Sequence, residues 1–356
     1  MSGTSLDGID VAALATDGRR QLAAGPALTV PYPEAFRERL RAVLGGAGPN
    51  TAIAAVEDEL TRLHASAIAT FRDNHPGVVV DIVGFHGHTI LHRPAERRTW
   101  QIGDGALLAQ LVGVDVVADF RSADVAAGGE GAPLAPLYHA ALAAGRAKPL
   151  AILNLGGVGN VTWIGEGESD ILAFDTGPGN ALIDDWVRRR TGRAADIDGA
   201  LARTGQAAAA HVARFVEHPY FARQPPKSLD RDEFQGALPE DLTLADGAAT
   251  LTEMTAAAAA TASRHFPMPP REWLVCGGGR RNPALMAALA RRLAAPVRPV
   301  EAAGWDGDAL EAQAFAYLAV RSVEGLPLSL PTTTGAPQPV CGGRLFPAAG
   351  SAATIP

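Results

Sequence analysis

The 356-residue chain contains little cysteine: Cys276 and Cys341 are the only two. Two cysteines exclude a disulfide framework and are typical of a reducing compartment. The chain also lacks an apolar run long enough to span a bilayer, and its first residues lack the basic-then-apolar pattern of a secretory signal. The sequence therefore predicts a cytoplasmic protein that does not associate with membranes.

Basic residues do not outnumber acidic ones, since 31 Lys and Arg face 38 Asp and Glu, for a net charge of −7. Without a block of basic residues, nucleic acid and anionic membrane surfaces are poor partners. The composition, 47% hydrophobic and 19% charged, is that of a globular protein. Because 356 residues exceed what one hydrophobic core usually supports, we expect two lobes.

Strand-like and helical segments alternate in both halves of the chain. We expect strands at 9–16, 78–85, 99–102, 150–155, 171–174 and 273–276, and helices at 53–71, 180–190, 251–265 (capped by Thr250) and 308–324. This alternation predicts α/β lobes whose sheets are at least partly parallel. A strand, a turn and a returning strand near the start of each half indicate duplicated lobes, as in actin-like kinases. We place the N-terminal lobe at residues 1–125 with a returning segment at about 320–356, and the C-terminal lobe at residues 126–319.

The first eleven residues combine small side chains with two aspartates. The small ones include Gly3, Thr4, Ser5 and Gly8. Such residues leave backbone N–H groups and hydroxyls free to close on phosphate oxygens. Asp7 and Asp10 are carboxylates of the kind that hold a hydrated Mg²⁺ beside phosphates. An ordinary tight turn explains so short a stretch equally well.

Two later loops repeat this small-residue pattern, at Asp175–Asn180 and Cys276–Arg280. The second loop contains Gly277, Gly278 and Gly279. A single glycine cluster is more often a plain turn than a binding site. Three separated loops of this type nevertheless indicate a nucleotide clamped between two lobes.

Taken in order, the motifs resemble the anhydro-N-acetylmuramic acid kinase family. They lie at residues 1–11, 86–89, 100–105, 116–136, 151–163, 174–186, 249–260, 275–286, 308–319 and 330–336. The resemblance implies a two-lobed, ribonuclease H-like fold of the actin, hexokinase and Hsp70 superfamily with a central nucleotide cleft. It also implies ATP and Mg²⁺ as cofactors, a homodimer, and a sugar substrate. Water would open the 1,6-anhydro bond while ATP phosphorylates O6, a step of peptidoglycan recycling.

Within this resemblance, Asp175 is our candidate for the catalytic base, because it ends a strand just before a helix, where open α/β sheets bind ligands. A carboxylate within reach of the attacking water would deprotonate it. A helix-capping aspartate is the alternative, since Asp-Thr-Gly-Pro is also good N-cap chemistry. The phosphate loop of the N-terminal lobe would be met by glycines of the other lobe, namely Gly156, Gly157, Gly177 and Gly179.

The candidates for sugar binding are His86, Thr89, Gln101, Asp104, Arg121 and Glu311. Arg121 would pair with the lactyl carboxylate as a bidentate fork, or form a surface ion pair with Asp119 or Asp124. His86 and His88 are two residues apart and lack a third nearby ligand, which argues against zinc.

The chain departs from the family pattern in three places. Relatives tend to carry Gln where His88 stands and where Glu130 stands, and they begin with a few more apolar residues. His88 and Glu130 favour an alternative, an actin-like kinase for another amino sugar. The short start favours another, a catalytically idle ATP-binding sensor of cell-wall fragments. The three glycine loops and Asp175 favour the kinase.

Overall fold

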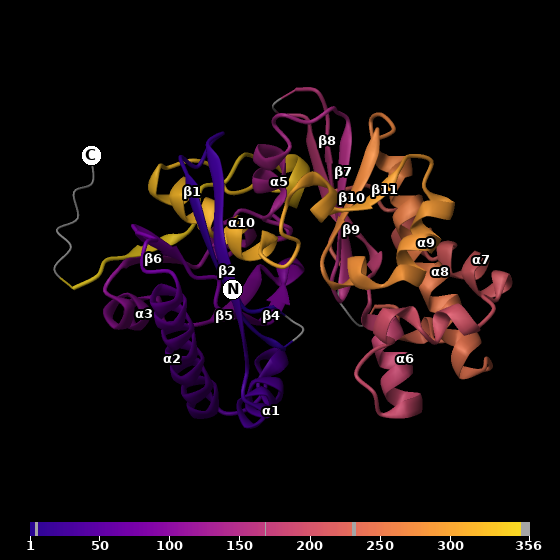
Figure 1. The fold of residues 1–356 in the computed structure, drawn as a ribbon, viewed down its shortest axis with the longest axis horizontal. Coiled ribbons are helices and arrows are strands. Elements are labelled where there is room, and N and C mark those ends of the chain that lie inside the picture. Colours follow the sequence, from indigo (N-terminus) through magenta and orange to yellow (C-terminus); the bar gives the residue numbers. More distant parts are fainter. Residues whose placement is uncertain (4–5, 168, 230–232, 350–356) are drawn as a thin grey trace. The chain divides into compact units, whose positions relative to one another are not determined.

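The computed structural model describes residues 1–3, 6–167, 169–229 and 233–349. The chain divides into two compact units (Figure 1): unit 1 comprises Met1–Ala144 and Ala309–Pro356, and unit 2 comprises Gly145–Asp308. Both units mix helices with strands, which confirms the predicted α/β class. Among the described residues, no helix is both long and apolar enough to cross a membrane.

Unit 2 is built on one five-stranded sheet with the order β11-β10-β7-β8-β9. The strands are β7 (Leu150–Leu155), β8 (Val158–Ile164), β9 (Ile171–Pro178), β10 (Glu272–Cys276) and β11 (Val297–Pro299). β7, β8 and β9 form an antiparallel meander, while β10 runs parallel to both β7 and β11. Three antiparallel strands followed by two parallel ones beside the first is the strand order of the ribonuclease H-like fold, as expected.

Helices cover one face of this sheet. They are α8 (Leu244–Ala262) and α9 (Pro283–Arg292), which lie against the strands in Figure 1. Ala256 and Ala259 of α8 are fully buried in one core with Phe174 and Trp273 of the sheet. Side chains as small as alanine let a helix approach a sheet closely. The alanine-rich segment is therefore packed structure.

A second core of unit 2 lies beside the sheet. It is formed by α6 (Ala181–Thr191), α7 (Ala209–Val216), the short 3₁₀ helix η5 (Pro219–Ala222) and the side of α8 away from the sheet core. Phe221 and Phe234 stack in it with ring centroids 5.5 Å apart, and Trp186 is fully buried. The aromatic packing fixes η5, which matters for the site.

Unit 1 divides its strands among three small sheets, β1-β2, β12-β6-β3 and β4-β5. Its strands are β1 (Gly8–Thr16), β2 (Leu22–Pro31), β3 (Ile82–Gly84), β4 (His88–Arg93), β5 (Arg98–Ile102), β6 (Asp115–Ala118) and β12 (Arg344–Phe346). Its helices are α1 (Glu34–Ala42), α2 (Asn50–Asn74), α3 (Gly105–Val112), α4 (Ser122–Ala126), α5 (Pro136–Leu142), α10 (Leu310–Val323) and α11 (Pro331–Thr334). α10 packs on both β1 and β3. The five-stranded sheet of unit 2 is thus not repeated as a single sheet.

The unit boundaries differ from those expected from the sequence, because residues 126–144 and 309–319 belong to unit 1. The reason is the packing of α5 on α10. The Tyr138 hydroxyl donates a hydrogen bond to Gln313 Oε1 at 2.8 Å, and the Tyr138 and Tyr317 rings lie 5.6 Å apart.

Several expected elements differ in their bounds. The strand expected at 171–174 extends to Pro178, so Asp175 does not end it as predicted. The strand expected at 78–85 is formed only by Ile82–Gly84. The helix expected from residue 251 begins at Leu244, and its N-cap is Thr243, not Thr250. The Thr250 hydroxyl instead donates to the Asp246 carbonyl one helical turn back, at 2.7 Å.

Candidate functional site

The first loop of unit 1 leads into β1. Thr4 and Ser5 lie outside the described residues. Asp7 is exposed, and Asp10 Oδ1 accepts a hydrogen bond from Thr29 Oγ1 at 2.7 Å. Glycine is required at position 8 for packing alone, because a Cβ there would lie 3.0 Å from Pro31 Cα on the paired strand.

The acidic residues of unit 1 influence one another. Desolvation raises the pKa of Glu311, the charge of Arg121 opposes the rise, and the charges of Asp10 and Asp7 add to it. In the described part of the chain, no three acidic, histidine or cysteine side chains converge as a ready metal site. Mg²⁺ at phosphates usually takes only one or two carboxylates and keeps several waters. Asp7 and Asp10 therefore fit a partial ligand set that phosphates and water would complete.

His86 and Arg121, both predicted to contact sugar, are hydrogen-bonded to each other. Arg121 Nε donates to His86 Nε2 at 3.0 Å, and Arg121 NH1 donates to the Gly131 carbonyl at 2.7 Å. His86 packs on the ring of Phe315, with centroids 4.5 Å apart. Burial, aided by the Arg121 charge, holds the pKa of His86 well below its usual value. His86 is therefore neutral, and Nδ1 donates to the Gly87 carbonyl at 3.0 Å.

Thr89 and Gln101 belong to a polar ladder on the β4–β5 hairpin. Gln101 Nε2 donates to Thr89 Oγ1 at 3.2 Å and to Thr99 Oγ1 at 2.8 Å. His92 lies 2.9 Å from Thr99 Oγ1 through Nδ1, and 2.9 Å from the Glu130 carbonyl through Nε2. Since a carbonyl only accepts, His92 Nε2 carries the proton and Nδ1 accepts from Thr99. Glu130 is next to Gly131, so the ladder and the His86–Arg121 pair are joined through one loop.

That loop is held by the buried carboxylate of Asp124. It accepts from the Gly131 N–H at 2.7 Å, from Thr334 Oγ1 at 2.6 Å, and from Ser329 Oγ. The Glu130 N–H also donates to the Thr334 carbonyl at 2.6 Å. Asp124 is thus satisfied in the interior by a loop N–H and two hydroxyl groups, rather than by an exposed ion pair.

Three further residues of unit 1 named from the sequence are His88, Asp104 and Glu311. His88 is fully buried, and its Nδ1 lies 2.9 Å from Ser2 Oγ, so it does not reach a ligand surface. Asp104 caps α3, since its Oδ1 accepts from the N–H groups of Ala106 and Leu107 at 2.9 and 3.0 Å. Glu311 stands in the first turn of α10.

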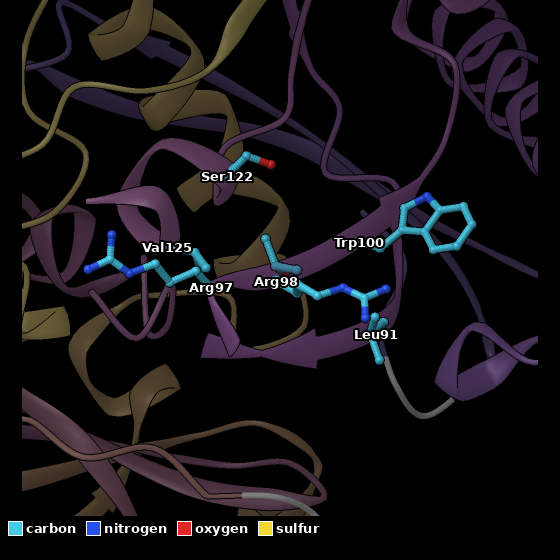
Figure 2. Close-up of a pocket in the computed structure, with 7 residues that line it drawn as sticks. Leu91, Arg97, Arg98, Trp100, Ser122 and Val125 are labelled. Atoms are coloured by element: carbon cyan, nitrogen blue, oxygen red, sulfur yellow. The ribbon is translucent and has the colours of Figure 1, made fainter. Parts of the chain in front are cut away.

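A pocket of about 280 Å³ adjoins the polar ladder. Figure 2 shows Trp100, Leu91 and Arg98 along its wall, with Arg97 extending away from Arg98. The residues that line it are Leu91, Arg97, Arg98, Thr99, Trp100, Ser122 and Val125. Thr99 is the residue that the pocket shares with the ladder.

In unit 2, three hydrogen bonds orient Asp175 on β9. Its N–H donates to the Lys227 carbonyl at 3.0 Å, its Oδ2 accepts from the Leu229 N–H at 2.8 Å, and its carbonyl accepts from the Tyr220 hydroxyl at 2.6 Å. The residue is 9% exposed. The Leu229 N–H thus orients the carboxylate, and the other two bonds hold the backbone that carries it.

The helix-capping interpretation of Asp175 is wrong. Helix α6 begins at Ala181, and its N-cap is Asn180. Asp175 lies inside the preceding strand, paired with Asn160 of β8. A capping role therefore does not explain this carboxylate.

The glycine turns of unit 2 meet at the carboxyl end of β7. Gly156 and Gly157 connect β7 to β8, and their carbonyls accept from Asn180 N–H at 2.7 Å and Gly179 N–H at 2.9 Å. The end of β7 also contacts the third turn, since a Cβ on Gly279 would lie 2.6 Å from Leu155 Cβ. The sequence predicted these clusters as one binding region, and within unit 2 they come together.

Arg280 anchors the third turn. Its NH1 donates to the Gly277 carbonyl at 3.0 Å, its Nε to Glu301 at 2.7 Å, and its NH2 lies 2.9 Å from Asp308 Oδ1. Gly277 has φ +73°, in the left-handed region that favours glycine. The contacts of Arg280 therefore fix the backbone of this turn.

Gly278, in contrast, is exposed and has open space where a Cβ would stand. We expect Gly278→Ala to fold normally but to raise the KM for ATP about tenfold, because an extra methyl against a ligand costs about 1–3 kcal/mol. The matched variant Gly279→Ala should lose about 1–3 kcal/mol of stability, because Leu155 fills the space. Thermal unfolding and ATP titration of both variants check this. An unchanged KM in Gly278→Ala would separate Gly278 from the nucleotide.

Sequence reasoning did not name His92, Thr99, Asp124 and Lys227 as neighbours of the candidate residues. For Thr99 a signal existed: it stands two residues before Gln101, so both project from the same face of an expected strand. Asp124 lacks such a signal, because its partners Ser329 and Thr334 lie some 200 residues later. Lys227 lacks one because it binds the backbone carbonyls of Tyr220 and Phe221, which every residue type carries.

Comparison with known proteins gives the family. The sequence profile described as anhydro-N-acetylmuramic acid kinase matches residues 1–348. The anhydro-N-acetylmuramic acid kinase of Paramagnetospirillum magneticum is 60% identical over 349 residues, covering 97% of each chain. That of Rhodospirillum rubrum is 60% identical over 352 residues, covering 98% of this chain and 93% of the relative.

Among solved structures, a ROK family glucokinase from Streptomyces griseus in complex with glucose and AMPPNP is 14% identical, covering 89% of this chain and 97% of that one, with a TM-score of 0.40. The fold class follows from the strand order of unit 2. The family profile and the relatives span nearly the whole chain. The chain therefore belongs to the anhydro-N-acetylmuramic acid kinase family.

Proposed function

We propose that this protein is an ATP-dependent kinase that opens 1,6-anhydro-N-acetylmuramic acid with water and phosphorylates O6. The product is N-acetylmuramic acid 6-phosphate, an intermediate of peptidoglycan recycling. The observation that carries the proposal is the family match over residues 1–348. The oriented carboxylate of Asp175, in the same unit as the glycine turns, supports it.

Asp175 is the catalytic base in this proposal. Its carboxylate takes a proton from a water molecule, whose oxygen forms a bond to the anomeric carbon of the sugar. The bond from the anomeric carbon to O6 breaks, and O6 forms a bond to the γ-phosphorus of ATP while ADP leaves. The Leu229 N–H at 2.8 Å from Oδ2 orients the base during this step.

The other predicted residues position the two substrates. Phosphoryl transfer depends mostly on positioning and charge neutralisation. Gly3, Asp7 and Asp10 of unit 1 would face the phosphates, and the two aspartates would hold Mg²⁺, which would supply charge neutralisation. Arg121, kept in place by His86 and Gly131, binds the lactyl carboxylate. That the two units serve one substrate pair stays a prediction, as do the homodimer and the cytoplasmic location.

The alternative of another amino sugar loses one of its supports. His88, whose identity favoured it, is fully buried against Ser2. A change at a buried position does not alter direct sugar contacts. No observation on the described residues favours the sensor alternative.

The test is turnover on purified sugars. We expect ADP release with 1,6-anhydro-N-acetylmuramic acid, and little with N-acetylmuramic acid, N-acetylglucosamine or glucosamine. In ¹⁸O-labelled water the label should enter the anomeric hydroxyl and not the phosphate, when product is analysed before anomeric exchange. Label in the phosphate, or equal turnover on a plain hexosamine, would contradict the proposed reaction.

ATP hydrolysis without sugar should be slow. Because transfer needs an aligned acceptor oxygen, hydrolysis to water should be about 10²-fold slower than kinase turnover. Phosphate release measured with and without sugar checks this. Rapid hydrolysis in the absence of sugar would contradict the predicted coupling.

A further inference from the structure

Lys227 is a buried cation in the segment that holds Asp175. It is one of only two lysines in the chain, beside Lys148, and it is 3% exposed. Burial, aided by the charge of Arg223, lowers the pKa of Lys227 to about 8. Burying an ammonium group is costly unless polar partners surround it, so its contacts need an explanation.

The ammonium group binds the carbonyl oxygens of η5. Lys227 Nζ donates to the Tyr220 carbonyl at 3.0 Å and to the Phe221 carbonyl at 3.4 Å. It also lies 4.6 Å from the centre of the Tyr220 ring, within cation–π range. His265 Nε2 donates to the same Phe221 carbonyl at 3.2 Å. The ammonium therefore contacts both the carbonyl and the ring of Tyr220, and these two contacts fix the position of this residue.

Tyr220 and Lys227 each contact Asp175. The Tyr220 hydroxyl donates to the Asp175 carbonyl, and the Lys227 carbonyl accepts from the Asp175 N–H. Two residues further along, the Leu229 N–H donates to the carboxylate itself. The Lys227 side chain thus ties together the two segments that contact Asp175, and Phe221 secures one of them in the aromatic core.

We propose that Lys227 is a positioning residue for the reaction: its ammonium group braces η5 against the 227–229 segment and so holds the Asp175 carboxylate in its catalytic direction. The inference rests on the proposed function, in which Asp175 is the base. Lys227 touches no substrate in this account and acts only through Asp175. Removing the charge should therefore reduce turnover and leave substrate binding nearly unchanged.

The experiment compares four variants of the full-length protein: Lys227→Met, Lys227→Arg, Asp175→Asn, and Lys227→Met combined with Asp175→Asn. Lys148→Met is the matched control, because Lys148 is a half-buried lysine of the same unit. We expect Lys227→Met to lower kcat about 10²-fold, the size of effect of a small misplacement, with KM for ATP and sugar changed less than about threefold. Lys227→Arg should recover part of the loss, and Lys148→Met should behave as the parent.

The double variant separates positioning from general damage. If Lys227 acts only through Asp175, the double variant should be no slower than Asp175→Asn alone. A further fall in the double variant, or normal kcat in Lys227→Met, would overturn the inference. Normal kcat in Asp175→Asn would instead overturn the proposed function, so the two failures are distinguishable. Circular dichroism of each variant identifies any that does not fold, and Lys227→Arg then supplies the test through its own kcat.

Discussion

Asp175→Asn is expected to lower kcat by about 10³-fold or more, within or above the range that general base catalysis contributes. The amide has nearly the same shape as the carboxylate, and its oxygen still accepts from the Leu229 N–H. It does not, however, accept a proton from water. The affinity for ATP should change little. Steady-state kinetics with a coupled ADP assay and calorimetric titration of ATP measure the two effects.

Asp185→Asn is the control for this variant. Asp185, on α6, is also a buried aspartate of unit 2, 8% exposed. It accepts a hydrogen bond from Gln235 Nε2 at 2.7 Å. It should retain kcat near that of the parent. Turnover of Asp175→Asn close to the parent value would remove Asp175 from the mechanism.

Unit 1 is expected to lose stability steeply as pH falls from about 6.5 towards 4. Burial lowers the pKa of His64 to about 3, and those of His88 and His139 to about 4. The unfolded chain takes up protons first, near the ordinary value of 6.5, so the stability is fully present above that pH. It is lost progressively towards the folded-state pKa. One pKa unit corresponds to about 1.4 kcal/mol, so each histidine contributes about 3 kcal/mol or more.

Urea unfolding at several pH values between 4 and 7.5 measures this dependence. His88→Gln should reduce the pH-dependent loss of unfolding free energy by the contribution of one histidine, about 3 kcal/mol. Glutamine does not titrate in this range, and its side chain still reaches Ser2. His64 and His88 both have Nε2 atoms without a hydrogen-bond partner among the described residues, so protonation there gains nothing in the fold. His75→Gln, at a half-buried histidine, is the control. Identical pH profiles for the parent and His88→Gln would contradict the assignment.

Much of the fold followed from sequence because its elements carry local signals. The strand at Ile9–Thr16 and the helix at 308–324 appear as β1 and α10 within a residue or two. β2 was missed as a named strand, because Leu22–Pro31 contains glycine and proline and buries no residue fully. Thr250 was mistaken for the cap although the true start of α8 carries a local signal, the Thr-x-x-Asp pattern of Thr243 and Asp246, in which the Asp246 N–H donates to Thr243 Oγ1.

The site was predictable in parts, for a physical reason. Glycine turns are local patterns, and those of unit 2 were found together, whereas Asp175 lies inside β9 and not at its end. The contacts that orient Asp175 come from residues about 50 positions later in the chain. Such a partner is chosen by tertiary packing, which no local spacing reveals. The same is true of Asp124, whose partners Ser329 and Thr334 lie some 200 residues away.

The interrupted path of the chain has a consequence for synthesis on the ribosome. Unit 2 is continuous from Gly145 to Asp308, whereas unit 1 needs α10 and β12 from the other end of the chain. Domains fold as units while the chain emerges. Unit 2 is therefore complete and able to fold while the first 144 residues still wait for their missing helix. Nascent unit 1, with β1 and β3 not yet covered by α10 and the edge of β6 not yet paired with β12, is the stage at which chaperones would engage this protein.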